Sequence, residues 1–475
     1  MCRTWLFSIL AFALIPHGLS ETQAQERSFW VWHRQTPITA EEDVELHHQG
    51  VRSLFWNAAD VDIRKGKWIW RSMSPPVETL APGFRVVPVV RLTGDGIPPF
   101  TPRLLAFLTE NLRVAAGPSG EAQIDFDCPD RLLDDYATAL QSIRREVPHL
   151  SITALAHWPR LSGFAALTRS VEGITPMFYD MQSDPTGVSA EAPPPPILDP
   201  VKVEAAMRAW SACPIPWRAG LPAFARLTVF DQTGLSRGQI PNWSWDDFCF
   251  HKGLVTLAPT HLGVTLLRAT IDTKVAATPI KSGEMVASRF TDRAALSKGT
   301  RQCANAGAAG VVFFRLPDET DPGGASLRDL GALDVPSSPR LVLRQSAEEQ
   351  LELVNESSFD LPPRLSGEKS DRDRGYALEI DAPAPLFREA LAGDFWRVAS
   401  HANPDAKKPV PTVVPFATRL TFWFSQLRAG AALRTGLLQL APGASLDPVR
   451  YRITHCEGSA QWKPISLSGT PAPPP

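Results

Sequence analysis

The sequence predicts an α/β fold, a (β/α)8 TIM barrel followed by a C-terminal antiparallel β-sandwich. Two observations support this prediction. Eight short apolar runs alternate with segments of helical periodicity between residues 28 and 335, the pattern of parallel strands joined by helices. Helical periodicity then nearly disappears after residue 340, where β-rich runs are separated by Pro, Gly, Asn and Asp.

The eight runs are the expected barrel strands. They cover residues 29–34, 51–57, 85–92, 122–127, 150–158, 173–180, 219–227 and 310–316. Three expected helices carry start signals. Thr39 and Glu42 form a capping box, and Thr101 and Asp199 each precede a proline at the first helical position.

Two insertions follow barrel strands, on the face where barrel enzymes build their active sites. Residues 183–196 end in four consecutive prolines, so we expect a stiff, extended spacer. Residues 231–287 hold the aromatic stretch N-W-S-W-D-D-F-C-F and two strand-like runs. We expect a small α+β excursion there.

The C-terminal region, residues 340–467, is the predicted β-sandwich. Such a domain binds sugars in some proteins and shields a barrel in others. We favour the structural role because no motif marks a binding face. Residues 468–475 are expected to form a flexible tail.

The N-terminus is typical of a secretory signal peptide over residues 1–24. Its apolar run from Trp5 to Ile15 is shorter than the ~20 residues of a spanning helix, and small residues follow it. We therefore expect a secreted or periplasmic protein with no membrane span in the mature chain. An uncleaved anchor is the alternative.

Composition excludes some functions. The 48 Lys and Arg balance 50 Asp and Glu, and no basic stripe is interleaved with aromatics, so a nucleic-acid partner is not expected. The cysteines are widely and irregularly spaced, which predicts neither a disulfide framework nor a zinc site, and at least one thiol should stay free. No metal or cofactor is expected, and the sequence does not indicate the oligomeric state.

The fourth predicted strand ends in two carboxylates. In Q-I-D-F-D-C-P, residues 123–129, Asp125 and Asp127 point to the same face because side chains alternate along a strand. Like charges side by side repel, so they suggest a function. A solvated pair at a strand end is the alternative.

Several strand ends resemble a bacterial family catalogued as domain of unknown function 3142. They are I-D-F-D-C-P at 124–129, L-S-I-T-A-L-A-H-W at 150–158, G-L-P-A-F-A at 220–225 and V-V-F-F-R-L-P-D-E-T-D at 311–321. The resemblance covers most of residues 29–330. It implies a barrel fold and no established activity.

A more distant resemblance is to the chitinase-like glycoside hydrolases of family 18. Their D-x-x-D-x-D-x-E signature aligns its last three acidic positions with Gln123, Asp125 and Asp127. Their M-x-Y-D motif resembles residues 177–180, and a G-L-P-x-Y-G-R run resembles residues 220–226. The signature places Asp127 where the family has its catalytic Glu, which is one methylene longer.

These residues predict a catalytic group of four, Asp125, Asp127, Tyr179 and Asp180. Glycoside hydrolysis needs an acid for the leaving oxygen and a second group that stabilises the developing cation. Asp127 with Asp180 would supply both. Alternatively, the resemblance implies that Asp125 and Tyr179 orient a substrate N-acetyl group that acts as the nucleophile.

Aromatic and basic residues near strand ends are candidates for substrate binding. They are Trp32, Trp56, Arg91, Trp158, Gln182, Phe314 and Arg315. Tryptophan faces stack on sugar rings, although a tryptophan in a strand also serves as core. The two arginines would bind an anionic group or pair with Asp125 and Asp127. His33 and His157 are proton-transfer groups or, more simply, structural histidines.

Taken together, the sequence predicts an exported glycoside-hydrolase-like protein that acts on a glycan, such as an N-acetylated sugar polymer, by acid-assisted hydrolysis. A non-catalytic glycan-binding barrel and an envelope scaffold are the alternatives.

Overall fold

The computed structural model describes residues 25–64, 67–94, 100–317, 323–336, 338–347, 349–365, 374–401, 409–410, 413, 415–456 and 460–465. The predicted signal peptide and C-terminal tail lie outside these residues. Within them, none of the helices is long and apolar enough to span a membrane.

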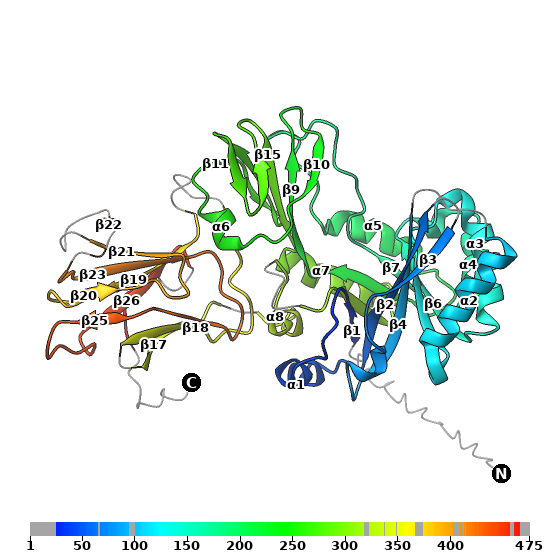
Figure 1. The fold of residues 1–475 in the computed structure, drawn as a ribbon, viewed down its shortest axis with the longest axis horizontal. Helices are drawn as coiled ribbons and strands as arrows, with labels where there is room; N and C mark the ends of the chain where they lie inside the picture. Colours follow the sequence, from blue (N-terminus) through cyan, green and yellow to red (C-terminus); the bar gives the residue numbers. More distant parts are fainter. Residues whose placement is uncertain are drawn as a thin grey trace, which may run out of the picture.

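A closed parallel barrel forms the N-terminal part of the chain (Figure 1). Its strands are β1 (Glu26–Val31), β2 (Ser53–Arg64), β4 (Arg85–Gly94), β5 (Glu121–Asp125), β6 (His149–Leu155), β7 (Gly173–Met177), β8 (Arg218–Pro222) and β16 (Gly310–Phe314). Strand β1 pairs in parallel with both β16 and β2, which closes the sheet. All eight predicted strands are therefore present, and the predicted barrel is confirmed.

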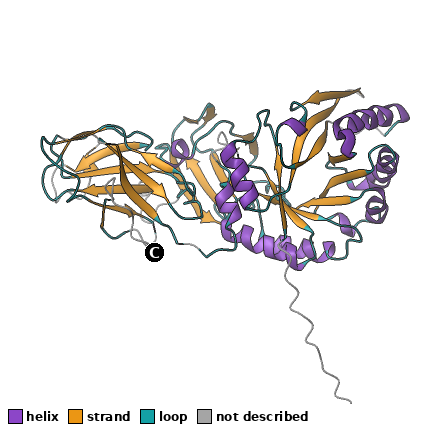
Figure 2. Ribbon diagram, turned by 90° about the horizontal axis from the view of Figure 1, so that it is seen from below, coloured by secondary structure: helices purple, strands orange, loops and turns teal. Residues whose placement is uncertain are grey.

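Helices cover most of the barrel's outer face (Figure 2). They are α1 (Ala40–His48), α2 (Pro102–Ala116), α3 (Leu133–Arg144), α4 (Phe164–Ser170), α5 (Pro200–Trp210), α7 (Arg293–Asn305) and α8 (Leu327–Gly331), with 3-10 turns η1 (Val77–Thr79), η2 (Gly117–Ser119), η3 (Asp130–Leu132) and η4 (Trp158–Arg160). Thr39, Thr101 and Asp199 cap α1, α2 and α5 as predicted, because each side chain accepts a backbone N–H of the first turn.

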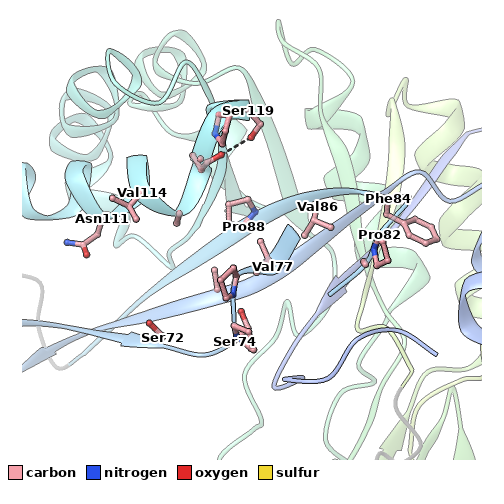
Figure 3. Close-up of a pocket in the computed structure, with 18 of the residues that line it drawn as sticks. Ser72, Ser74, Val77, Pro82, Phe84, Val86, Pro88, Asn111, Val114 and Ser119 are labelled. Carbon is pink, nitrogen blue, oxygen red and sulfur yellow. Dashed lines mark hydrogen bonds between the residues drawn. The ribbon is translucent and has the colours of Figure 1, made fainter. Parts of the chain in front are cut away.

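The second strand departs from the regular pattern. After β2 the chain turns back as β3 (Lys67–Ser72), which pairs antiparallel with β2, and only η1 precedes β4. A full helix is therefore missing over β2 and β4. The gap holds a cavity of about 650 Å³ between these strands and α2. Figure 3 labels part of its lining, Ser72, Ser74, Val77, Pro82, Phe84, Val86, Pro88, Asn111, Val114 and Ser119.

An excursion follows β8, as expected. Its elements are β9 (Ala225–Phe230), β10 (Ser236–Gln239), α6 (Trp245–Cys249), β11 (Leu254–His261), β12 (Val264–Ala269), β13 (Thr273–Val275), β14 (Thr278–Ile280) and β15 (Met285–Phe290). Five of the strands form one sheet in the order β10-β9-β15-β12-β11, and β13 pairs with β14. We call this part the insertion.

The C-terminal part consists of antiparallel sheets around one apolar core. One sheet contains β17 (Leu341–Ala347), β18 (Gln350–Asn355) and β24 (Ala432–Arg434). A larger sheet contains, in spatial order, β22 (Pro409–Val410), β21 (Arg397–His401), β23 (Arg419–Phe424), β19 (Tyr376–Asp381), β26 (Arg450–Thr454) and β27 (Lys463–Pro464), and β20 (Phe387–Ala390) pairs with β25 (Leu438–Leu440). The predicted sandwich is confirmed.

Two aspartates of the loop after β7 attach the insertion to the barrel. Arg226 and Arg289 lie directly opposite each other on β9 and β15, where like charges destabilise a strand pair. Asp180 neutralises Arg226, and Asp184 neutralises Arg289 with an N–O distance of 2.5 Å. The Arg289 side chain is only 3% exposed, so its guanidinium is nearly withdrawn from water, whereas Asp184 is 23% exposed.

We expect Asp184→Asn to destabilise the insertion, because it leaves the Arg289 guanidinium buried without a carboxylate. Removing one partner of a buried ion pair costs about 3 kcal/mol. The loss is measured as a lower unfolding temperature in calorimetry and as faster hydrogen exchange in β9 and β15.

The matched control is the double variant Asp184→Asn with Arg289→Met, which removes both charges and should recover most of the lost stability. Exchange rates in β9 and β15 that stay at wild-type values in the single variant would refute this account.

Candidate functional site

The two carboxylates of β5 lie at the carboxyl end of the barrel. Asp125 ends the strand and is partly buried, whereas Asp127 follows it and is exposed. Strand β6 pairs with β5 so that Ile152 lies opposite Ile124, which brings Thr153 beside Asp125. The Thr153 hydroxyl donates to Asp125 Oδ1 at 2.8 Å and accepts the Phe126 N–H at 3.2 Å. Thr153 therefore fixes the orientation of Asp125.

Both carboxyls hold their protons more tightly than a free aspartate does. Burial raises the pKa of Asp125 to about 6, the Thr153 hydrogen bond opposes that rise, and the charge of Asp127 adds to it. The pKa of Asp127 is raised because protein atoms displace water around its carboxyl, and Arg91 opposes that rise. Among the described residues, Asp127 forms no hydrogen bond or ion pair, so its exposed carboxyl is available to a ligand.

Tyr179 lies close to these carboxyls on an aromatic floor. Its ring stacks on Phe314 with centroids 5.7 Å apart and meets Phe224 edge-on at 6.0 Å. Burial raises its pKa far above 10, and the charges of Asp125, Asp180 and Asp127 contribute in that order. The hydroxyl is therefore neutral at physiological pH and can donate a hydrogen bond to a ligand.

A buried polar layer supports the floor. Trp30 Nε1 donates to Gln123 Oε1 at 2.7 Å, and Gln123 Nε2 donates to Thr175 Oγ1 at 3.3 Å. A side chain at Gly220 would place its Cβ 2.8 Å from the Trp30 ring, so glycine is required there. Gln123 is fully buried, and as a neutral amide it satisfies both partners without burying a charge.

Asp180 is not free to act with Asp127. Its backbone adopts φ of 49°, and its carboxylate accepts two N–H groups of Arg226 at 2.6 and 2.5 Å. Both oxygens of this carboxylate are therefore engaged by one guanidinium, and the side chain is held in the ion pair. The structure thus brings Asp125, Asp127 and Tyr179 together and engages Asp180 in attaching the insertion.

Arg91 lies on β4, where it is the register partner of Asp125. It donates to both carboxylate oxygens of Asp60, its partner in the β2–β4 register, at 3.2 and 2.5 Å. Its guanidinium lies 5.8 Å from the Trp32 ring. The predicted pairing of Arg91 with Asp125 and Asp127 is therefore wrong, because Asp60 is its carboxylate partner.

Trp32 and Phe314 complete the floor, with ring centroids 5.7 Å apart in an edge-on contact, although Trp32 is only 7% exposed. Arg315 follows Phe314 and lies near the exposed His33. The pKa of His33 is lowered by burial first and then by the charges of Arg315 and Arg91. The His33 side chain is therefore mainly neutral at physiological pH.

The remaining candidates lie away from Asp127. Trp56 and Trp158 have no exposed surface and belong to the outer core between strands and helices. Gln182 donates to Asp199 at 3.4 Å and lines a cavity of about 380 Å³ beside the proline-rich loop. His157 pairs with Asp130 at 2.9 Å on the surface. None of these four side chains contributes to the geometry around Asp127.

The sequence did not single out the residues that position the acids. Thr153, Thr175 and Asp60 face the barrel interior, and their only signal is alternation with outward-facing core residues. Within the described residues, no group of three His, Cys, Asp or Glu side chains could hold a metal ion.

No family model matches the chain, and no curated protein is similar to it. Similar solved structures include the spore cortex-lytic enzyme SleL of Bacillus megaterium, with 13% identity, a TM-score of 0.44, and coverage of 63% of this chain and 72% of that one. A putative chitinase domain from Desulfitobacterium hafniense has 14% identity, a TM-score of 0.44, and coverage of 65% and 97%.

A third is a glycoside hydrolase family 18 N-acetylglucosaminidase from Paenibacillus barengoltzii, with 14% identity, a TM-score of 0.39, and coverage of 61% and 95%. All three scores and identities are low. We therefore base the fold on the strand pairing and the site on its own geometry.

We expect Thr153→Val to raise the pKa of Asp125 above about 6, because the lost hydrogen bond favours the ionised carboxyl. NMR titration of ¹³C-labelled aspartate carboxyls measures the change. Thr175→Val is the matched control, since Thr175 contacts Gln123 and not Asp125. An unchanged Asp125 titration in the first variant would show that the hydrogen bond is unimportant.

We also expect Asp125→Asn to gain stability relative to the wild type as the pH rises from 4 to 7. The folded pKa of about 6 lies above the ordinary 3.8, so the stability that Asp125 contributes below pH 4 is lost as the pH passes 6. The gain should be about 1–2 kcal/mol, reduced by the partial exposure of the side chain. Urea unfolding of both proteins across this pH range measures it, and parallel curves would contradict it.

Proposed function

We propose that the protein is an exported glycoside hydrolase that cleaves a glycan by acid-assisted hydrolysis, with Asp127 as the proton donor. The observation that carries this proposal is the pair of carboxyls with raised pKa values, one exposed and one partly buried, beside Tyr179 on an aromatic floor. A general acid near neutral pH needs such a raised pKa.

The second group required by hydrolysis is the substrate itself. Asp180 is held by Arg226, so it does not serve as a carboxylate nucleophile. Asp125 and the neutral Tyr179 hydroxyl are available to orient an N-acetyl group, whose carbonyl oxygen attacks the anomeric carbon as the glycosidic bond breaks and Asp127 protonates the leaving oxygen. Water then opens the cyclic intermediate, and its proton returns to Asp127. The substrate class is therefore an N-acetylated sugar polymer. The partly exposed Phe314 is the aromatic residue available to a sugar ring here.

A non-catalytic glycan-binding barrel is the second candidate. The observation in its favour is that Asp127 is one methylene shorter than the glutamate of the family 18 signature. A displacement of about 1 Å costs about 100-fold in rate. Both candidates use the same aromatic floor and differ only in turnover.

We expect Asp127→Asn to lower kcat on N-acetylated oligosaccharides by 10²–10⁴-fold with little change in KM, because the amide cannot donate the proton. Asp127→Glu keeps the acid and should retain measurable turnover. Product formation from a panel of reducing-end-labelled glycans is the readout.

Asp130→Asn is the matched control, since Asp130 is an exposed aspartate of the same loop that pairs with His157. Wild-type binding without any turnover, unaffected by Asp127→Asn, would favour the binding barrel over the hydrolase.

A further inference from the structure

The larger sheet of the sandwich presents a regular outer face. Its inner residues, such as Leu378, Phe422 and Ile453, belong to the apolar core, so the alternate residues of each strand face outward. The register aligns these outward residues in rows across β21, β23, β19 and β26. The rows are Arg397, Trp423, Ala377 and Thr454, then Ala399, Thr421, Glu379 and Arg452, then Arg419, Asp381 and Arg450.

Four arginines of this face lie over two tryptophans. The Arg397 guanidinium is 4.0 Å from the centroid of Trp423. Arg452 is 4.7 Å from the Trp462 ring, and Arg419 and Arg450 are each 5.6 Å from it. We call Arg397, Arg419, Arg450, Arg452, Trp423 and Trp462 the arginine–tryptophan face. Cation–π contacts of this kind order the guanidinium groups and leave N–H donors at their edges.

The arginine–tryptophan face carries more positive than negative charge. Asp381 accepts from both Arg419 and Arg450 at 3.0 Å, and Glu379 accepts from Arg452 at 2.6 Å. Among the described residues, Arg397 has no carboxylate partner. Four arginines against two carboxylates leave a net charge of +2 here, whereas the whole chain carries −2. An anion is therefore attracted to this face.

The donors are accessible. Arg450 is 56% exposed and Arg452 33%, and Arg397 is also exposed. The row position between Trp423 of β23 and Thr454 of β26 is the small residue Ala377 of β19, so no large side chain separates these two positions. An extended polymer can therefore lie across β23, β19 and β26. Aligned residues on β23 and β26 are about 10 Å apart, which is two strand spacings.

We propose that the arginine–tryptophan face binds an acidic polysaccharide, whose carboxylate or sulfate groups accept hydrogen bonds from Arg397, Arg450 and Arg452. Guanidinium groups bind such anions in a bidentate manner. The proposal adds a second glycan site to the chain and does not depend on the chemistry at Asp127.

Two other polyanions fit less well. Nucleic-acid strands stack bases on open aromatic rings, whereas arginines lie over both tryptophans here. Anionic membranes are bound by basic faces with protruding apolar side chains. The exposed Trp396 precedes Arg397 and stacks on Phe250 of the insertion, so it does not belong to this face.

Isothermal titration calorimetry tests the proposal on the full chain carrying Asp127→Asn, so that the barrel cannot degrade the probe. The probes are polygalacturonate, its fully methyl-esterified neutral form, and dextran sulfate. Polygalacturonate or dextran sulfate should bind with an affinity that falls as salt increases, and the neutral polymer should not bind. Arg397→Gln with Arg452→Gln should weaken binding at least ten-fold.

Two further variants separate recognition from folding and from bulk charge. Arg397→Lys with Arg452→Lys keeps the charge and loses the bidentate geometry, so we expect an intermediate loss of affinity. Arg113→Gln with Arg388→Gln removes two exposed arginines elsewhere and should bind like the parent. Unchanged unfolding temperatures show that each variant is folded.

Equal binding of the neutral polymer, unchanged affinity of the Gln double variant, or no binding of either acidic polymer overturns the proposal. Tighter binding of duplex DNA or of phosphatidylglycerol vesicles also overturns it. Hydrolysis of a neutral N-acetylated oligosaccharide by the chain with Asp127 intact is measured separately. Failure of that assay contradicts the hydrolase and leaves this proposal standing.

Discussion

The closure of the barrel by β1 is the constraint on which the rest of the structure depends. Because β1 pairs with both β16 and β2, the eight strands enclose an interior that must be filled. Trp30 is one of the aromatic residues that fill it, its ring leaves room only for a glycine at position 220, and its indole N–H donates to Gln123. The buried Trp30–Gln123 contact lies directly below the carboxyl end of the barrel, where Asp125 and Tyr179 are the next inward-facing residues.

Charge distribution follows from that geometry. Charged side chains gather where the strands end, and they differ in whether an opposite charge pairs with them. Arg226 and Arg289 each receive an aspartate, and Arg91 receives Asp60. Asp125 receives only the hydroxyl of Thr153, and Asp127 receives no partner among the described residues. Burial is the main cause of the raised pKa values of both acids, and the charge of Arg91 opposes the rise without an ion pair to either one.

Apolar runs and capping residues were sufficient to predict the eight strands and several helix starts, because both are local properties of the chain. Partners far apart in sequence could not be predicted. The sequence predicts Asp180 as a catalytic acid, because no residue near it in the chain indicates that it pairs with Arg226, which lies 46 residues later. For Trp56 the core alternative holds, because neighbouring Phe55 faces the interior and Trp56 therefore points to the outer core. The helix missing after β2 was likewise not apparent from composition.

The ion pair of Asp180 connects the acids of the barrel with the arginine–tryptophan face of the sandwich. Asp180 and Asp184 hold the insertion to the loop after β7, and the insertion in turn holds the sandwich. Asp246 of α6 accepts the Ser425 N–H at 3.0 Å, and the Arg374 side chain donates to the Leu254 carbonyl at 2.8 Å. The loop after β7 therefore influences the orientation of the arginine–tryptophan face, because its residues Asp180 and Asp184 hold the insertion that contacts the sandwich.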